Sequence, residues 1–364
     1  MLIVKEVYLC HRINHKKRKM KKNLRNILVL AMGLMTTVSF AQDWDADSRT
    51  RIDMSGDGDE MSTDQRATVG ATWGGSDWSI HGSTNVNYTL GTGNAATIGV
   101  YEAYASTDLM GYASVTAGRQ ALDYGSGAIM SSNQWGANRA TWDGFTFGLD
   151  LDMADVSFGY ASTSGAVSDE TGRSQMWLNA AKGEGDWNAN LLYMSTTLGA
   201  ADAMTAMGLD LSYAMMGGDL SLDVSYNTAT GYGAEDMDMT MLGATYNVNE
   251  SMSITASQTT YGENGFNVGS ASMGGFASSG SLGYLGANDE NLSIGGAYGM
   301  GDFTLGATMS TISNEVSGAD DREVMDLSVG YTMSANANLS LSMITDNDGT
   351  TETNYMWVTL NIMP

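Results

Sequence analysis

The stretch 118–144, GRQALDYGSGAIMSSNQWGANRATWDG, contains the side chains that are best placed for chemistry. Arg119 and Arg139 bracket a long polar connection, with Asp123 and Asp143 close to them in the sequence. Opposed charges of this kind create a field across a constriction in selective pores. We expect the connection to fold inward and to offer a docking point for a carboxylate or a sugar hydroxyl. The alternative is that both arginines pair with carboxylates at a rim. The candidate lining residues are Arg119, Gln120, Asp123, Tyr124, Trp135, Arg139 and Asp143.

A second candidate site is the acidic loop 53–64, DMSGDGDEMSTD. Acidic or hydroxyl side chains occupy positions 1, 3, 5, 7 and 12 with Gly at position 6, which approximates a calcium loop of hard oxygen ligands. Position 9 is Met61, position 12 is Asp64 rather than Glu, and no helices flank the loop. A solvated acidic loop is therefore the favoured interpretation, and calcium is the only cofactor that we consider. The candidate ligands are Asp53, Asp57, Asp59 and Asp64.

Histidine offers little support for catalysis. His81 is the one histidine after the N-terminal leader, and Ser79 and Ser83 share its face. A Ser-His hydrolase also needs an orienting group. The polar face of His81 is predicted to point into a lumen, whereas a lipid hydrolase presents its site to lipid. We therefore expect a solvated lumen residue and no enzymatic activity.

The N-terminal leader is basic and then apolar. Residues 27–38 form a twelve-residue apolar run that follows Lys21, Lys22 and Arg25 and precedes Ala41, as in a secretory signal with cleavage after Ala41. The run is shorter than the roughly 20 residues of a membrane-spanning helix. We expect Met20 to be the true initiator, so that residues 1–19 are an over-extended start. Residues 20–41 are then the signal peptide and residues 42–364 a single domain.

Removing the leader makes the chain strongly acidic. Nine of the 17 Lys and Arg and one of the 41 acidic residues precede Gln42, which leaves 8 basic and 40 acidic residues and a net charge of −32. Such a charge excludes nucleic acid as a plausible partner. The single cysteine, Cys10, lies in the leader, so the mature chain cannot form a disulfide.

The residues 209–227, LDLSYAMMGGDLSLDVSYN, show the pattern on which the rest of the chain is built. Apolar and polar residues alternate with period two on both sides of a tight turn, which predicts an amphipathic β-hairpin. Gly217 and Gly218 are expected to supply the positive-φ positions of the turn.

Short and long connections alternate strictly along the chain. Besides the turn at 216–219, short turns are predicted at 74–77, 107–109, 152–155, 182–186, 247–250, 299–302 and 334–337. Longer polar connections lie near 55–64, 91–95, 120–139, 164–173, 198–204, 229–236, 262–288, 313–321 and 347–351. This alternation is expected when every strand crosses a slab, as in outer-membrane barrels with short periplasmic turns and longer external loops.

We therefore predict an all-β fold, an antiparallel up-and-down transmembrane β-barrel. A sheet in lipid cannot leave an edge unpaired, so it must close. Eight short turns give sixteen strands, and the flanking segments 48–54 and 352–362 raise the estimate to about eighteen, with both termini periplasmic. The alternatives are a water-soluble β-sandwich and a solenoid, but a sandwich needs no alternation of loop lengths and no fixed short repeat is present.

The stretch 118–144 also resembles the signature of alginate-export-type and related porin-like outer-membrane proteins of Gram-negative bacteria. The resemblance is carried by Gly118-Arg119-Gln120, Tyr124-Gly125, Trp135 and Asp143-Gly144. It implies an eighteen-stranded barrel that conducts anionic polysaccharide or small solutes through a narrowed lumen. The chain departs from the pattern because few basic residues remain for a polyuronate path, and because Pro364 replaces the usual terminal aromatic residue.

Together these observations predict an outer-membrane channel for passive diffusion of small hydrophilic solutes, including saccharides or uronates. The alternative is a structural or adhesive barrel without an open pore. The expected partners are outer-membrane lipid, lipopolysaccharide and the solutes themselves. We expect a weak cation preference set by the acidic external loops, while the arginines bind anionic groups inside. The sequence leaves open whether the barrel is a monomer or a trimer.

Overall fold

The computed structural model describes residues 41–56, 61–93, 95–136, 139–163, 172–199, 201–318 and 320–363. The chain divides into two units, Met1–Gln42 and Asp43–Pro364. The second unit holds the whole sheet except the first two residues of its first strand. The predicted over-extended start at 1–19 and nearly all of the predicted signal peptide at 20–41 lie outside the described residues, so both remain predictions.

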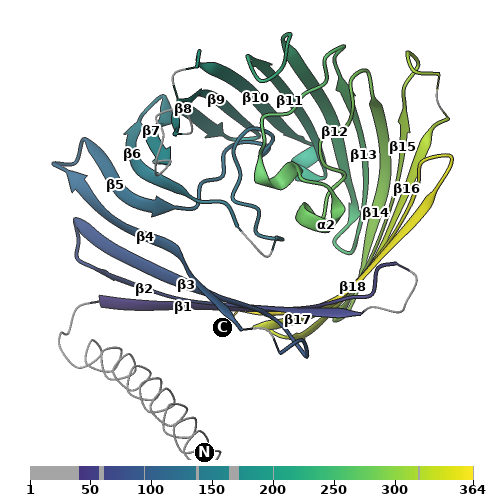
Figure 1. Ribbon diagram of the computed structural model, residues 1–364, viewed down its shortest axis with the longest axis horizontal. Helices are drawn as coiled ribbons and strands as arrows, with labels where there is room; N and C mark the ends of the chain where they lie inside the picture. Colours follow the sequence, from purple (N-terminus) through teal and green to yellow (C-terminus); the bar gives the residue numbers. More distant parts are fainter. Residues whose placement is uncertain are drawn as a thin grey trace, which may run out of the picture. The chain divides into compact units, whose positions relative to one another are not determined.

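The second unit is a closed antiparallel β-barrel of 18 strands, as predicted (Figure 1). Strands that follow one another in the sequence pair with each other, and β1 pairs with β18 from Ser48↔Ile362 to Asp53↔Trp357, which closes the sheet. The strands are β1 (Ala41–Asp53), β2 (Ser62–Gly74), β3 (Trp78–Thr89), β4 (Thr97–Leu109), β5 (Ala113–Gln120), β6 (Trp142–Leu151), β7 (Ala154–Thr163), β8 (Arg173–Glu184), β9 (Trp187–Leu198), β10 (Met204–Met215), β11 (Leu220–Thr230), β12 (Met237–Asn249), β13 (Met252–Tyr261), β14 (Glu290–Met300), β15 (Phe303–Ser313), β16 (Arg322–Ser334), β17 (Ala337–Asn347) and β18 (Glu352–Ile362).

The predicted short turns join consecutive strands, with one displacement. In the β10–β11 hairpin, the 3₁₀ turn η1 (Met216–Gly218) places Gly217 at φ 74° and Gly218 at φ 102°, as the sequence predicted. The turn predicted at 107–109 was wrong by about three residues, because β4 continues through Leu109. The chain reverses instead at Met110 and Gly111, whose φ values of 59° and 75° are left-handed.

The two faces of the wall have opposite chemistry. In β10, Leu209, Leu211 and Tyr213 are exposed on the outer face, whereas in β11 the inward Ser225 and Asn227 are almost completely buried. This is the alternation expected when lipid lies outside and polar groups lie inside. Among the described residues, no helix has the length and apolar character needed to span a membrane.

Two long connections fold into the barrel (Figure 1). We call the described residues 121–136 and 139–141 the first inward segment and residues 262–289 the second. The first was expected inside; the second was predicted to be an external loop, and this was wrong. The second segment contains η2 (Ala271–Met273) and the short helix α2 (Phe276–Ser279). It folds inward because Phe266 and Val268, 1% and 4% exposed, pack in an apolar cluster.

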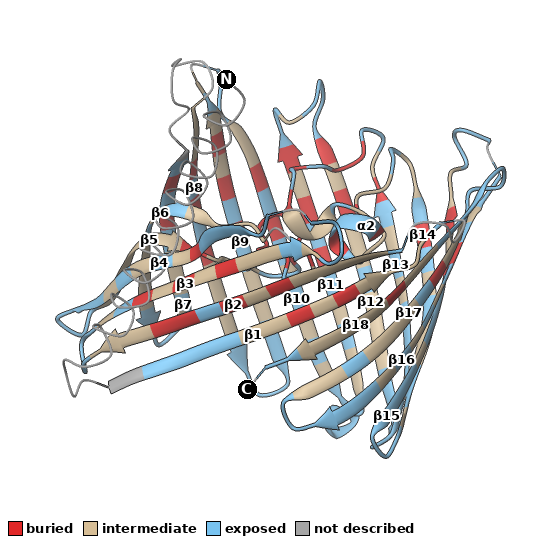
Figure 2. Ribbon diagram, turned by 60° about the horizontal axis from the view of Figure 1, so that its bottom comes forward, coloured by how far each residue is buried: buried red, intermediate tan, exposed pale blue. Residues whose placement is uncertain are grey.

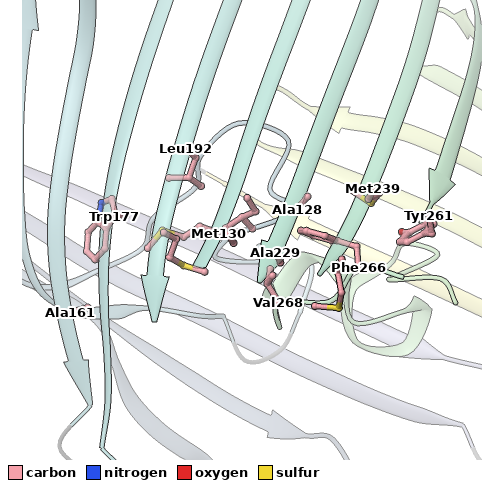
Figure 3. Packing of buried hydrophobic residues seen from close by; sticks show 14 residues of the cluster. Ala128, Met130, Ala161, Trp177, Leu192, Ala229, Met239, Tyr261, Phe266 and Val268 are labelled. Carbon is pink, nitrogen blue, oxygen red and sulfur yellow. The ribbon is translucent and has the colours of Figure 1, made fainter. Parts of the chain in front are cut away.

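That cluster joins both segments to the wall. It contains Ala128 and Met130 of the first segment, Phe266 of the second, and wall residues such as Trp177 and Leu192 (Figure 3). A second cluster packs Phe276 of α2 against wall residues of β15 to β18. In Figure 2 the buried residues of the strands gather around the inward segments. Apolar burial therefore fills part of a lumen that an eighteen-stranded wall would otherwise leave open.

Gly144 of β6 provides a test of the wall's packing. A Cβ atom there would lie 1.9 Å from the carbonyl oxygen of Tyr160, whereas a Cβ at Gly82 of β3 would meet nothing within 4 Å. We expect Gly144→Ala to destabilise the barrel by about 1–3 kcal/mol through overpacking. Gly82→Ala should be neutral or stabilise by up to about 1 kcal/mol, because it only restricts the unfolded chain.

The measurement is the temperature at which the detergent-folded barrel loses its folded gel mobility. Equal midpoints for the two variants would show that β6 and β7 do not approach each other this closely.

Candidate functional site

Arg139 of the first inward segment lies deep in the lumen, with only 4% of its side chain exposed. Its Nη2 donates to Thr68 Oγ1 and Asn85 Oδ1, both at 2.7 Å, and its Nη1 donates to Gln134 Oε1 at 2.9 Å. The guanidinium also lies over the Tyr101 ring, 3.4 Å from the centroid. Arg139 is therefore held on the lumen side by β2, β3 and β4, and its role in a constriction stays a prediction.

Three further arginines of the wall surround this segment. Arg66 of β2 donates from Nη1 to the carbonyl oxygens of Gln134 and Gly136, at 3.1 and 2.7 Å. Arg51 and Arg49 of β1 lie over the Trp135 ring, 4.0 and 5.9 Å from its centroid. We call Arg49, Arg51, Arg66 and Arg139 the arginine cluster.

The arginine cluster has more donors than partners. Each of its wall residues, Arg49, Arg51 and Arg66, is about 95% buried. Nε and Nη1 of both Arg49 and Arg51 are buried and have no hydrogen-bond acceptor among the residues that the structure describes. Asp47 supplies the carboxylate within ion-pair distance among the described residues, 3.6 Å from Arg66 and 3.7 Å from Arg139. Unpaired buried charge is costly, so the cluster is chemically suited to an anion.

Sequence reasoning missed the three wall arginines of this cluster. Arg49 and Arg51 are two residues apart in a segment that was recognised only as a flanking strand, and Arg66 belongs to the next strand. The available signal was the spacing of Arg49 and Arg51, because residues two apart in a strand point to the same face. Two arginines on one face stand out in a mature chain that holds just seven.

Four other predicted lining residues lie on the lumen side: Gln120, Asp123, Tyr124 and Trp135. Their side chains contact other residues of the first segment or of the wall and are not free to line an open surface. Trp135 meets Trp357 edge to face at 5.4 Å. Asp123 accepts hydrogen bonds from both the backbone and the hydroxyl of Ser132, at 2.7 and 2.6 Å. The Tyr124 hydroxyl bonds to Trp177 Nε1 at 3.2 Å. Gln120 is buried at the end of β5.

Arg119 and Asp143 do not line the lumen, contrary to the prediction. They are direct cross-strand partners in β5 and β6, joined at 2.6 Å (Nε to Oδ1) and 2.7 Å (Nη2 to Oδ2). Side chains alternate along a strand, so Asp143 shares its face with Phe145, which is 51% exposed and paired with Tyr160. The pair therefore lies on the outer face, with Arg119 and Arg139 separated by the wall.

The two inward segments are tied together by buried hydrogen bonds. The Tyr284 hydroxyl donates to the Ala128 carbonyl at 2.8 Å and accepts from the Ser270 backbone N–H at 3.0 Å. Ser270 Oγ donates to the Gly127 carbonyl at 2.6 Å. Burial raises the pKa of Tyr284 from 10.0 to about 12. Its stabilising contribution is complete below pH 10 and is lost as the pH rises through about 12.

The opposite side of the lumen is acidic. A cavity of about 530 Å³ lies between Ser126 of the first segment and strands β7 to β12, and its lining includes Asp155, Asp210 and Asp223. Asp210 accepts a hydrogen bond from the Ser126 backbone N–H at 3.0 Å. The arginine cluster beside β1 and β2 therefore lies across the barrel from the carboxylates of β7, β10 and β11. These are not the residues that were predicted to create such a field.

The predicted calcium site is only partly described. Asp57 and Asp59 lie outside the described residues. Asp53 Oδ1 accepts the Ser55 backbone N–H and Asp64 Oδ1 accepts the Thr89 hydroxyl, both at 2.9 Å. No metal-binding group of three or more His, Cys, Asp or Glu occurs within the described ranges. The calcium loop remains a prediction.

His81 points into the lumen but is buried, not solvated as predicted. Its Nδ1 lies 2.9 Å from Thr72 Oγ1, and its ring stacks on Tyr104 at 5.0 Å. Its Nε2 lies 3.8 Å from Glu102 Oε2. Among the described contacts, no hydrogen bond joins His81 to Ser79 or Ser83.

No family model and no curated protein matches this sequence. Its fold is similar to solved outer-membrane porins of Gram-negative bacteria. OccD3 (OpdP) of Pseudomonas aeruginosa has a TM-score of 0.66 and 13% identity, covering 90% of this chain and 92% of that one. OccAB2 of Acinetobacter baumannii has a TM-score of 0.68 and 13% identity, covering 90% and 99%. OpdK of P. aeruginosa, solved with vanillate, has a TM-score of 0.66 and 12% identity, covering 90% and 100%. The chain therefore shares the fold of these structures, a closed 18-stranded β-barrel, while the alginate-export-type resemblance stays a prediction.

Proposed function

We propose that this protein is an outer-membrane channel for passive diffusion of small hydrophilic solutes, and that it favours solutes with a carboxylate, uronates included. The observation that carries the proposal is the arginine cluster. Four guanidinium groups gather at one point of the lumen, and two of them, those of Arg49 and Arg51, keep buried N–H donors for which the described part of the chain supplies no acceptor. A planar guanidinium matches a carboxylate in a bidentate geometry.

A passing anion meets two opposite fields. Exposed acids at the long-loop end, among them Glu235, Asp236, Asp320 and Asp321, repel anions and concentrate cations over a Debye length of about 8 Å. The arginine cluster lies further inside, where burial reduces screening. We therefore expect a weak overall cation preference together with tight local docking of single carboxylates. OpdK, which was solved with vanillate, has a small carboxylate as its ligand, which is compatible with this class of solute.

The proposed orientation places the short turns in the periplasm and the long connections outside. In the β1–β18 pairing, Ser48 of β1 lies opposite Ile362, the last residue of β18. The first residues of β1 and the last residues of β18 therefore lie at the end of the barrel that carries the short turns. Both termini would then be periplasmic, and lipopolysaccharide would surround the end with the long connections.

The competing function is a structural or adhesive barrel without an open pore. The two inward segments and their apolar clusters favour it, because they occupy part of the lumen. The cavity of about 530 Å³ beside Ser126, with Asp155, Asp210 and Asp223 in its lining, favours the channel.

Reconstitution in a planar lipid bilayer separates these functions. A channel should give discrete conductance steps, and in liposomes glucuronate should enter faster than expected from its size relative to glucose. A barrel that inserts and yet gives neither conductance steps nor solute entry would support the adhesive function and refute the channel.

Arg49 offers the cleanest test of the anion preference, because its buried Nε and Nη1 donate to no acceptor within the described ranges. We expect Arg49→Gln to shift the reversal potential toward cations and to weaken block of the current by glucuronate severalfold. Arg322→Gln with Asp346→Asn is the control, since it removes both partners of an ion pair at 2.7 Å and leaves the net charge unchanged. Equal block in the wild type and Arg49→Gln would place the docking point elsewhere.

A further inference from the structure

Residues 118–120 of β5 pair with residues 142–144 of β6 just before the chain leaves the wall as the first inward segment. The β5–β6 register has three consecutive pairs at this point: Gly118↔Gly144, Arg119↔Asp143 and Gln120↔Trp142. The motif is therefore the root of the segment, and the channel function proposed above uses none of its charged groups.

On the outer face, Arg119 joins three strands. Its bidentate contact with Asp143 couples β5 to β6, and its Nη1 donates to the Val100 carbonyl of β4 at 3.3 Å. The β4–β5 pairing begins only at Ala103↔Arg119, so the β4 residues before Ala103 have no partner in β5. The guanidinium therefore bonds to the unpaired edge of β4 at the level where β5 ends and β6 begins.

On the inner face, other contacts hold the same root. Glu102 Oε1 accepts the backbone N–H of Ala121, the first residue of the segment, at 3.1 Å. Trp142, the residue after the segment, donates from Nε1 to Gln175 Oε1 at 3.1 Å. Hydrogen bonds on the lumen side therefore hold both ends of the segment to the wall. On the outer face the Arg119–Asp143 ion pair joins the two strands from which the segment leaves.

An ion pair is an expensive choice for this position. Arg119 lies six residues beyond Ala113, which is about 15 Å above the short-turn end at a typical strand rise and tilt. The apolar band of such barrels is about 25 Å tall, and a charged residue facing lipid there costs up to about 4 kcal/mol. Both side chains are nevertheless substantially exposed, 39% and 46%. An uncharged pair at these positions would avoid this cost, so the ion pair is an unusual way to join the last rungs of β5 and β6.

We propose that the Arg119–Asp143 pair is a latch that holds the first inward segment in its constricting position. The inference rests on the proposed channel function. Removing either charge leaves the other unpaired beside lipid, which favours opening of the last rungs of β5 and β6. The segment then moves about its two ends, Trp135 and Arg139 move away from the wall arginines Arg49, Arg51 and Arg66, and the passage widens. Arg119 and Asp143 are positioning residues in this scheme and do not contact the solute.

The electrical test compares Arg119→Ala, Asp143→Ala and the exchanged pair Arg119→Asp with Asp143→Arg. Both alanine variants should raise the mean single-channel conductance and increase current fluctuations, whereas the exchanged pair should return toward the wild type. Arg322→Ala with Asp346→Ala is the matched control, a bidentate pair at 2.7 Å without a described hydrogen bond to either inward segment. It should keep the wild-type conductance, and heat-modifiable gel mobility confirms that each variant is folded.

A cross-link tests the same latch without current. Ser126 Oγ of the segment lies 3.1 Å from Ser225 Oγ of β11, and the mature chain has no cysteine. The substitutions Ser126→Cys and Ser225→Cys should form a disulfide quickly under mild oxidation, and more slowly when Arg119→Ala is added. Once formed, the disulfide should restore wild-type conductance to the Arg119→Ala variant, and dithiothreitol should reverse the effect.

The outcomes separate the latch from the channel. A wild type without conductance steps refutes the channel, and the cross-linking rate still decides whether Arg119 positions the segment. Unchanged cross-linking and unchanged conductance in Arg119→Ala would overturn the latch. A raised conductance that the disulfide fails to reduce would also overturn it, because the widening would then have another origin.

Discussion

Backbone N–H and C=O groups that face lipid have no water to bond, and each unsatisfied group costs several kcal/mol. This constraint requires the sheet to close, and the β1–β18 pairing closes it. It also explains the two-sided strands, because one face must be apolar while the other is free to be polar. Arg119 belongs to the same constraint, since it donates to the Val100 carbonyl at an edge where β4 has no β5 partner.

Closure with 18 strands creates a wide lumen, and the inward segments narrow it. Their positions follow from two apolar clusters and from hydrogen bonds such as that between Tyr284 and Ala128. Once the first segment is fixed, Trp135 and Arg139 meet the arginines of β1 and β2. The chain thus concentrates four of its seven mature arginines at one point of a protein that is otherwise strongly acidic. Function in this account depends on where a few charges are held within an apolar framework.

Much of the barrel was predictable because strand period and turn chemistry are local. The bounds of β18, Glu352–Ile362, and the positive φ of Gly217 and Gly218 followed directly from the sequence. The site was less accessible, because it joins Arg49 and Arg51 to Arg139, almost ninety residues later. Arg119 was assigned to the wrong face because β5 is short and rich in small residues, so its sequence does not reveal which side is apolar. The second inward segment is rich in Gly and Ser, and only its contacts show that Phe266 is buried.

The central claim is that the first inward segment forms the constriction and carries the selectivity of the channel. The most direct test is the single-channel conductance of a variant in which residues 122–140 are replaced by a short glycine-serine linker. The account predicts a folded barrel with a severalfold larger conductance and weaker block by glucuronate, because Trp135 and Arg139 no longer narrow the passage beside Arg49 and Arg51. A folded barrel with wild-type conductance and undiminished block would contradict the account.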